Sequence, residues 1–418
     1  MQRNTVKSER RRGLRAVVVV TAWAALLVGC SRVGRQDSEE NFLYKVSSGE
    51  TICVHRAGSG PRSVLLLPGN NCSGASFRPL LSLVQETEAL GSAYTFYAFD
   101  YRGSGGSTYE NMVSTLEDFA KDFDDVVQAD PRLRRGDLIL VGHSMGFGVA
   151  LAMVDLRPNA YACVVSLAGI GTRGVRVLFA GGTCGEEPAS GTRYGFGDWA
   201  DGLSAVAFQQ RSRSGPGCTR DDVKSIWDAV VFNDVLKYDV ATGSRTDEDA
   251  VQSSDYDALI DDVMSVRYMP ESLYAAHRFN FSMQTVSHVN RDGTVVTIPG
   301  AGRLDGFAGK RVLLVKAKTD RSNWRGDLVL DDSITQNTKY DLREAGACVT
   351  AVVLQPGRGF DHGFPFHHPE ETVSMVVGFI EADEEISQDA LDEMLGEGTG
   401  VVYPSEDRSW ERERYGGF

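Results

Sequence analysis

The sequence is short of positive charge, and its few Cys follow no metal-binding spacing. Its 43 Lys and Arg are outnumbered by 57 Asp and Glu, which leaves a formal net charge of −14. Because a nucleic-acid-binding surface needs a basic face to contact phosphates, this balance argues against nucleic acid as a partner. The seven Cys show no spacing typical of a zinc site. These exclusions leave an acidic globular protein with an ordinary hydrophobic content of 42%.

The apolar run at the N-terminus is too short to span a bilayer comfortably. Residues 16–28 follow a basic head, and this order is typical of a secretory signal. Leu27-Val28-Gly29-Cys30 is similar to the lipobox of bacterial lipoproteins, in which the Cys is lipidated and becomes the mature N-terminus. We therefore expect residues 1–30 to be a lipoprotein-type signal peptide and residues 31–42 to be a linker that holds an exported domain off the membrane. Simple secretion with Cys30 unmodified, or a signal anchor, is the alternative.

Six Cys remain once Cys30 is set aside, and an even number in an exported protein permits disulfides. Cys184 and Cys218 lie in the same region of the chain, so they are the pair that we expect first. Free, buried thiols are the alternative.

A strand, a Gly-flanked Ser and a helix follow one another within residues 137–150, DLILVGHSMGFGVA. The short apolar run 138–141 is typical of a strand buried on both faces, and the apolar stretch 147–154 suits a helix. Between them stands Gly142-His143-Ser144-Met145-Gly146. A Gly-x-Ser-x-Gly turn in this context predicts a nucleophile elbow, in which the Ser is exposed at a strained turn and the Gly residues let helix and strand approach closely. The stretch resembles the α/β-hydrolase superfamily.

The rest of the chain agrees with this resemblance. Strands alternate with helices on both sides of the motif, which predicts an α/β fold with a doubly wound, mostly parallel sheet. The alternation stops at Gly169 and resumes at Arg311, and the stretch between is too long for a loop. We expect residues 171–309 to be an inserted, mainly helical cap, placed where this superfamily usually has one. The hydrolase core then comprises residues 43–170 and 310–381, and the acidic residues 382–418 are expected to be a loosely packed extension.

The resemblance implies a catalytic triad in the chain order Ser, Asp, His. Among the seven His, His362 follows the last strand of the core and precedes Pro369 at the spacing of the family's catalytic His loop, so we expect it to be the general base for Ser144. The acid normally follows the seventh strand, where Asp320 stands, and we expect Asp320 to orient His362. Asp327 also fits if the loop is longer.

Two backbone N–H groups are expected to form the oxyanion hole. The first belongs to Met145, after the nucleophile, and the second to Asn70, in a loop where many relatives have His-Gly and this chain has Pro68-Gly69-Asn70. The stretch 100–107 is similar to the family's D-x-R-G-x-G-x-S loop, whose role is structural. The chemistry that the resemblance implies needs no metal and no organic cofactor.

These residues predict a serine hydrolase that cleaves a carboxylic ester of a small-molecule acyl substrate through an acyl-enzyme intermediate. An exopeptidase or amidase is the second hypothesis, and thioesterase, perhydrolase and C–C bond hydrolase stay open because the fold does not determine the substrate. A Ser at the elbow argues against dehalogenases and epoxide hydrolases, which use Asp there. A surface-anchored binding protein with an idle triad is the alternative outside enzymes, and an intact Ser, Asp and His in the right order argue against it.

Overall fold

The computed structural model describes residues 40–134, 136–174, 219–238, 253–267, 272, 275–276, 279–289, 295–320, 322–382 and 385–410. The expected signal peptide with Cys30, most of the linker and the expected Cys184–Cys218 pair lie outside these residues. Within the described part, no helix has both the length and the apolar character needed to cross a membrane.

Nine strands form one sheet in the order β1-β2-β4-β3-β5-β6-β9-β10-β11. The six strands from β4 to β10 in this order are parallel, whereas β1 and β2 at one edge and β11 at the other run antiparallel to their neighbours. This is the mostly parallel sheet that the sequence predicts. The strands are β1 (Glu40–Lys45), β2 (Thr51–Gly58), β3 (Arg62–Leu67), β4 (Tyr94–Phe99), β5 (Leu138–His143), β6 (Tyr161–Leu167), β9 (Arg311–Ala317), β10 (Cys348–Leu354) and β11 (Gly400–Tyr403).

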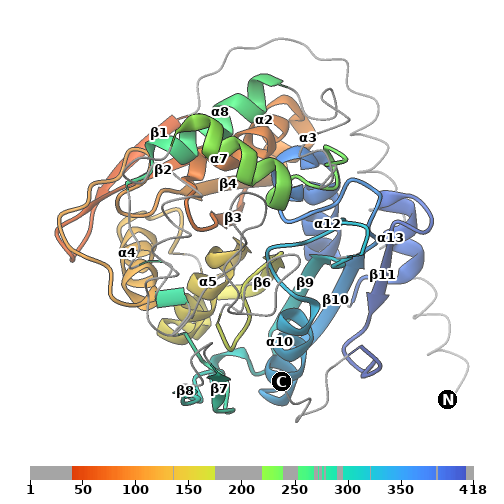
Figure 1. Ribbon diagram of the computed structural model, residues 1–418. Coiled ribbons are helices and arrows are strands. Elements are labelled where there is room, and N and C mark those ends of the chain that lie inside the picture. Colours follow the sequence, from red (N-terminus) through yellow and green to blue (C-terminus); the bar gives the residue numbers. More distant parts are fainter. Residues whose placement is uncertain are drawn as a thin grey trace, which may run out of the picture.

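Helices cover both faces of the sheet (Figure 1). Side chains of one strand point alternately to opposite faces, so in β5 Leu138 and Leu140 join one apolar cluster while Ile139 and Val141 join the other. On the first face lie α4 (Leu116–Ala129), α5 (Met145–Leu156) and α10 (Asp332–Glu344). On the second lie α2 (Arg78–Glu86), α3 (Glu88–Ala93), α12 (Pro369–Glu381) and α13 (Gln388–Leu395). Burial on both faces explains why the parallel strands are continuous apolar runs.

The chain between β6 and β9 adds mainly helical elements outside the sheet. They are α7 (Arg220–Ile226), which continues as the π-helical turn η3 (Trp227–Val231), α8 (Ser253–Ser265), and a hairpin of β7 (Val286–Val289) and β8 (Val295–Ile298). In Figure 1, α7 and α8 (green) lie over the end of the molecule that carries α2 and α3. The carboxylate of Asp262 ties α8 to the core, because it accepts hydrogen bonds from the backbone N–H (3.0 Å) and the hydroxyl (2.5 Å) of Ser73. The Asp292-Gly293 pair, a sequence typical of a two-residue hairpin turn, lies between these strands and outside the described residues.

The expectation of a loosely packed C-terminal extension is wrong for residues 385–410. Leu391 of α13 is completely buried against the sheet, and β11 extends the sheet by pairing with β10. The side chain of Gln388 ties the helix to the new strand, since it donates to the carbonyl of Gly400 (3.0 Å) and accepts from the N–H of Val402 (2.9 Å). The acidic residues of this segment lie on the solvent side of these elements. The composition alone therefore does not reveal the apolar face that packs against the sheet.

Candidate active site

Ser144 occupies a strained backbone conformation between β5 and α5. Its φ of 51° and ψ of −119° lie in a region that costs a non-Gly residue about 1–3 kcal/mol. Backbone hydrogen bonds hold the turn: the N–H of Ser144 donates to the carbonyl of Leu167 (3.1 Å), and its own carbonyl accepts from the N–H of Ile170 (2.9 Å). Ser144 is partly exposed, whereas His143 and Met145 on either side are buried. The turn therefore presents the Ser hydroxyl at the carboxyl end of the sheet.

Two Gly residues of the motif allow the strand and the helix to meet. A Cβ atom on Gly146 would lie 2.1 Å from the carbonyl oxygen of Leu67, at the end of β3. A Cβ atom on Gly142 would lie 2.5 Å from the Cα atom of Phe147 in α5. Both distances are far below any real contact, so only Gly fits at these positions.

The helix start and the loop that carry the two expected oxyanion donors lie next to Ser144. Met145 is the first residue of α5, so its N–H belongs to the helix N-terminus. A Cβ atom on Gly69 would lie 3.2 Å from Cβ of Ser144, which places the loop that continues into Asn70 beside the Ser. The side-chain oxygen of Asn70 accepts a hydrogen bond from the hydroxyl of Ser272 (3.0 Å), so the inserted segment reaches this loop.

His362 follows β10 and is clamped to the elbow strand. Nε2 of His143 lies 2.9 Å from the carbonyl oxygen of His362, and because a carbonyl only accepts, Nε2 of His143 carries the proton. Nδ1 of His143 is then buried, with no hydrogen-bond partner among the described residues. Burial, and then the nearby His362, lower the pKa of His143 to about 3, so its ring is neutral. Nδ1 of His362 lies 3.2 Å from Oδ1 of Asp327.

The acid that faces His362 is thus Asp327, and the expectation for Asp320 is corrected. The Asp320 carboxylate accepts hydrogen bonds from the side chain of Asn323 (2.9 Å), the hydroxyl of Ser322 (2.8 Å) and the backbone N–H groups of both residues (each 3.1 Å). These bonds, first of all that from the Asn323 side chain, lower the pKa of Asp320. Asp320 therefore closes a local turn, and the loop runs on to bring Asp327 under His362.

Asp327 is an ionised carboxylate in a completely buried position. Burial by itself raises its pKa, but the Lys316 ammonium and His362 outweigh this effect and hold the pKa well below its usual range. Its Oδ1 atom also accepts from the N–H groups of Val329 (3.0 Å) and Leu330 (2.8 Å). A carboxylate cannot donate, so Nδ1 of His362 is the donor and Nε2 is left with the lone pair.

Asp100 has the structural role that the sequence predicts. Its carboxylate accepts from the backbone N–H groups of Gly74 (2.7 Å) and Gly106 (2.8 Å) and lies 2.9 Å from Nε2 of His55. With Cys53, these two side chains form the one cluster of metal-ligand type in the described part of the chain. Burial and then Asp100 raise the pKa of Cys53 to about 12, so the thiol stays protonated, and the carboxylate is already used by the loop. The cluster is therefore better explained as a set of hydrogen bonds that hold the loop in place than as a metal site.

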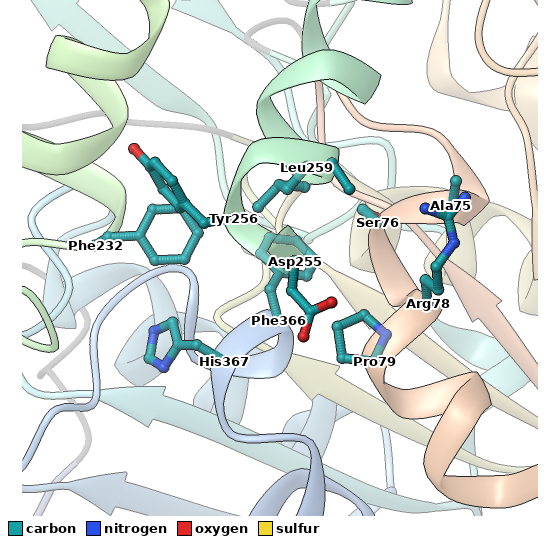
Figure 2. A pocket seen from close by; sticks show the side chains of 11 residues that line it. Ala75, Ser76, Arg78, Pro79, Phe232, Asp255, Tyr256, Leu259, Phe366 and His367 are labelled. Carbon is teal, nitrogen blue, oxygen red and sulfur yellow. The ribbon is translucent and has the colours of Figure 1, made fainter. Parts of the chain in front are cut away.

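A separate, shallow hollow lies between α2, α8 and the short helix α11 (Phe364–His367) (Figure 2). The ring of Phe366, which lines this hollow, packs edge-on against the ring of His143, with the centroids 4.8 Å apart. None of the residues that approach Ser144 lines it. Its walls include Phe232, Tyr256, Leu259 and Phe366, and in the view of Figure 2 Asp255 lies in the middle and Arg78 on the right.

A mostly parallel sheet with helices on both faces and a Ser at a strained strand-to-helix turn defines the class of α/β-hydrolases. The family described as the alpha/beta hydrolase family matches residues 64–375, which is well over half of the chain. The chain therefore belongs to the alpha/beta hydrolase family and is a hydrolase.

Individual relatives are distant or partial. A 2-(acetamidomethylene)succinate hydrolase from Mesorhizobium japonicum is 31% identical over 117 residues, which are 28% of this chain and 38% of that protein. An esterase from Exiguobacterium antarcticum has 15% identity and a TM-score of 0.53, over 82% of this chain and 100% of its own. A serine hydrolase from Cycloclasticus zankles has 16% identity and a TM-score of 0.51, over 82% and 98%. At these identities the two solved structures share the fold.

Proposed function

We propose that this hydrolase cleaves carboxylic esters of small molecules through an acyl-enzyme intermediate formed on Ser144. The observation that carries the proposal is the pairing of His362 with the buried Asp327 (3.2 Å) in a chain whose elbow presents Ser144. The ionised Asp327 places the proton of His362 on Nδ1 and so leaves Nε2 as the base that a Ser nucleophile needs.

The proposed steps use side chains and backbone of this chain alone. Nε2 of His362 takes the hydroxyl proton of Ser144 as Oγ attacks the ester carbonyl carbon, and Asp327 stabilises the resulting imidazolium. The N–H groups of Met145 and Asn70 hold the oxyanion. The alcohol then leaves with the proton from His362. A water molecule, deprotonated by His362, attacks the acyl carbon, and the acid departs as Ser144 recovers its proton.

The apolar packing of Met145, next to the nucleophile, favours an uncharged acyl group. Met145 belongs to the same apolar cluster as Ala229 and Val230 of η3 and Ala275 and Ala276 of the inserted segment. An exopeptidase would need, in addition, an acid that holds the substrate amine. We therefore rank ester hydrolysis above peptide or amide hydrolysis, and an idle binding protein last.

The test is labelling by a fluorophosphonate probe of purified protein that starts after Cys30, with Ser144→Ala alongside. Only the wild type and the surface control Ser92→Ala, whose side chain is exposed on α3, are expected to be labelled. A panel of ester, thioester and aminoacyl-amide substrates then ranks the bond types, and esters are expected to give the highest kcat/KM. A folded wild type that takes no label would move the binding-protein hypothesis to the front.

We also propose that the protein is exported and anchored to a membrane through a lipid on Cys30, on the basis of the lipobox-like sequence. Metabolic labelling with a fatty-acid analogue is expected to mark the wild type in the membrane fraction. Cys30→Ala is expected to lose both the label and the membrane association, and an unlabelled soluble wild type would instead indicate simple secretion.

A further inference from the structure

A buried lysine stands behind the acid of the candidate site. Lys316 lies near the end of β9, and its side chain is 1% exposed. The ammonium is 3.1 Å from Oδ2 of Asp327, 3.6 Å from Oδ1 of Asp332 and 2.6 Å from the carbonyl oxygen of Leu330, to which it donates. A buried ammonium is costly unless oxygen atoms of this kind surround it.

The two oxygens of Asp327 have separate tasks. Oδ1 faces Nδ1 of His362 and accepts from two backbone N–H groups of the loop. Oδ2 is buried and accepts no hydrogen bond in the described structure, so the charge that compensates it is the Lys316 ammonium. This division fixes the plane of the carboxylate and keeps Oδ1 toward His362.

We propose that Lys316 is a positioning residue of this hydrolase. It holds Asp327 in the orientation that serves His362, and its positive charge offsets part of the carboxylate's charge at the imidazole. This inference rests on the triad proposed above and adds a residue that acts on His362 through Asp327.

The other charged groups near this chain of contacts are accounted for. Asp332, on α10, lies on the far side of the Lys316 ammonium and draws on its charge. The neutral His143 ring stands 5.0 Å from the His362 ring, centroid to centroid. Asp361, although next to His362 in sequence, pairs with Nε2 of His367 (2.8 Å). Among the described residues, Lys316 is thus the cation placed directly against the acid of His362.

The test compares Lys316→Met, Lys316→Arg and Asp332→Asn in the folded protein. The main measurement is the pH titration of the imidazole ¹⁵N resonances of His362, assigned by their loss in His362→Gln. In Lys316→Met the resonances are expected to titrate at a pH higher by about one unit, because the carboxylate attracts the imidazolium unopposed. Lys316→Arg restores the charge and is expected to titrate near the wild type. Asp332→Asn removes a negative charge beside the Lys316 ammonium. The His362 resonances are therefore expected to titrate at a lower pH than in the wild type, by less than the shift in Lys316→Met.

Kinetics give the second measurement. The acidic limb of the kcat/KM profile is expected to move with the NMR titration, and Lys316→Met is expected to lose about tenfold in kcat with KM unchanged, since the contact affects the base and not substrate binding. A role in packing alone would lower the unfolding temperature and leave the titration of His362 where it is, and that result overturns the proposal.

Two arms keep the outcomes distinct. If Lys316→Met does not fold, Asp332→Asn provides the test. A His362 titration at the same pH as in the wild type, or at a higher pH, contradicts the proposal. If the wild type neither labels at Ser144 nor turns over esters, the proposed function fails, whereas the NMR titration still tests the coupling from Lys316 to His362.

Discussion

The turn at Ser144 and the loop at Asp327 deliver side chains to the same site, but different forces hold them. Backbone contacts build the Ser144 turn, with helix and strand so close that Gly146 has no room for a Cβ atom. Charge and side-chain hydrogen bonds build the acid loop. Lys316 pairs with Asp327, and the indole N–H of Trp324 donates to the carbonyl of Ala229 (2.9 Å) in the inserted segment.

The difference teaches which part of the site can be tuned. A turn held by excluded volume either forms or does not, because close-packed backbone has no intermediate arrangement. A loop held by an ion pair and by contacts with the inserted segment responds to pH, to nearby charge and to movement of that segment. We therefore expect changes at the turn to be all-or-none and changes at the loop to be graded.

The largest effect is expected at the turn. Gly146→Ala places a methyl group 2.1 Å from the carbonyl of Leu67, so we expect a loss of about 4 kcal/mol or more in the free energy of unfolding, or no folded protein. The matched control is Gly309→Ala, where φ is +73° but no atom lies within 4 Å of the new Cβ, so only about 1 kcal/mol is expected. Urea unfolding measures both, and equal losses would show that the close approach to Leu67 is not what makes Gly146 necessary.

The next effect separates the two acids of the loop. Asp327→Asn is expected to lower kcat by about 10³- to 10⁴-fold, because the amide cannot hold His362 in the tautomer that leaves Nε2 as a base. Asp320→Asn is expected to stay within a few-fold of the wild type, since Asn also closes local turns of this kind. Steady-state kinetics with an ester substrate measure both, and the reverse order would return the acid's role to Asp320.

The same contrast explains how much could be predicted from the sequence. The strand, the Ser and the helix of the elbow are adjacent in the chain, so the pattern of Gly and apolar residues is enough to predict them. The choice between Asp320 and Asp327 depends on whether a turn closes early, and the hydrogen bonds from Ser322 and Asn323 that close it follow no pattern that the sequence makes plain. The role of Lys316 could not be predicted, because the sequence of an apolar strand does not indicate which side chain its Lys will pair with.

Small shifts at helix starts have the same local cause. The spacing of Ser114 and Glu117 predicts a capping box at the start of α4, whereas in the structure Thr115 and Asp118 form it, one residue later. The carboxylate of Asp118 accepts from the N–H groups of Ser114 (2.8 Å) and Thr115 (3.0 Å). With two hydroxyl residues and two acids in a row, composition favours a capped start without deciding its register.

A pH-dependent effect is expected where the turn meets the His loop. The pKa of His143 is about 3 in the folded state, so below about pH 6.5 the unfolded chain binds a proton that the folded protein refuses. Stability therefore falls as the pH falls, by about 1.4 kcal/mol per unit. His143→Gln keeps a donor for the carbonyl of His362 and removes this titration, so it is expected to lose about 2 kcal/mol less than the wild type between pH 7.5 and 5.

His368→Gln provides the control for that experiment. Although burial lowers the pKa of His368, its contacts with Glu371 and other neighbours raise it overall. A raised pKa contributes stability below the unfolded value that is lost as the pH rises, so this variant is expected to change acid stability in the opposite direction. If both variants moved acid stability the same way, the neutral state of His143 would not be the cause.

The smallest effect tests whether the graded behaviour extends to the contact between the inserted segment and the His loop. Asp234, just after η3, accepts from the N–H of Gly357 (2.7 Å), and burial first of all raises its pKa to about 6. Because the folded pKa is raised, the stability that it contributes is complete below about pH 4 and is lost as the pH rises through 6. Asp234→Asn keeps an acceptor for Gly357 and cannot ionise, so its stability relative to the wild type is expected to grow by on the order of 1–2 kcal/mol between pH 4 and 7. Unfolding measured across this range, with the exposed Asp389→Asn as control, gives the slope, and equal slopes in all three proteins would mean that this contact is held like the Ser144 turn, by packing and not by charge.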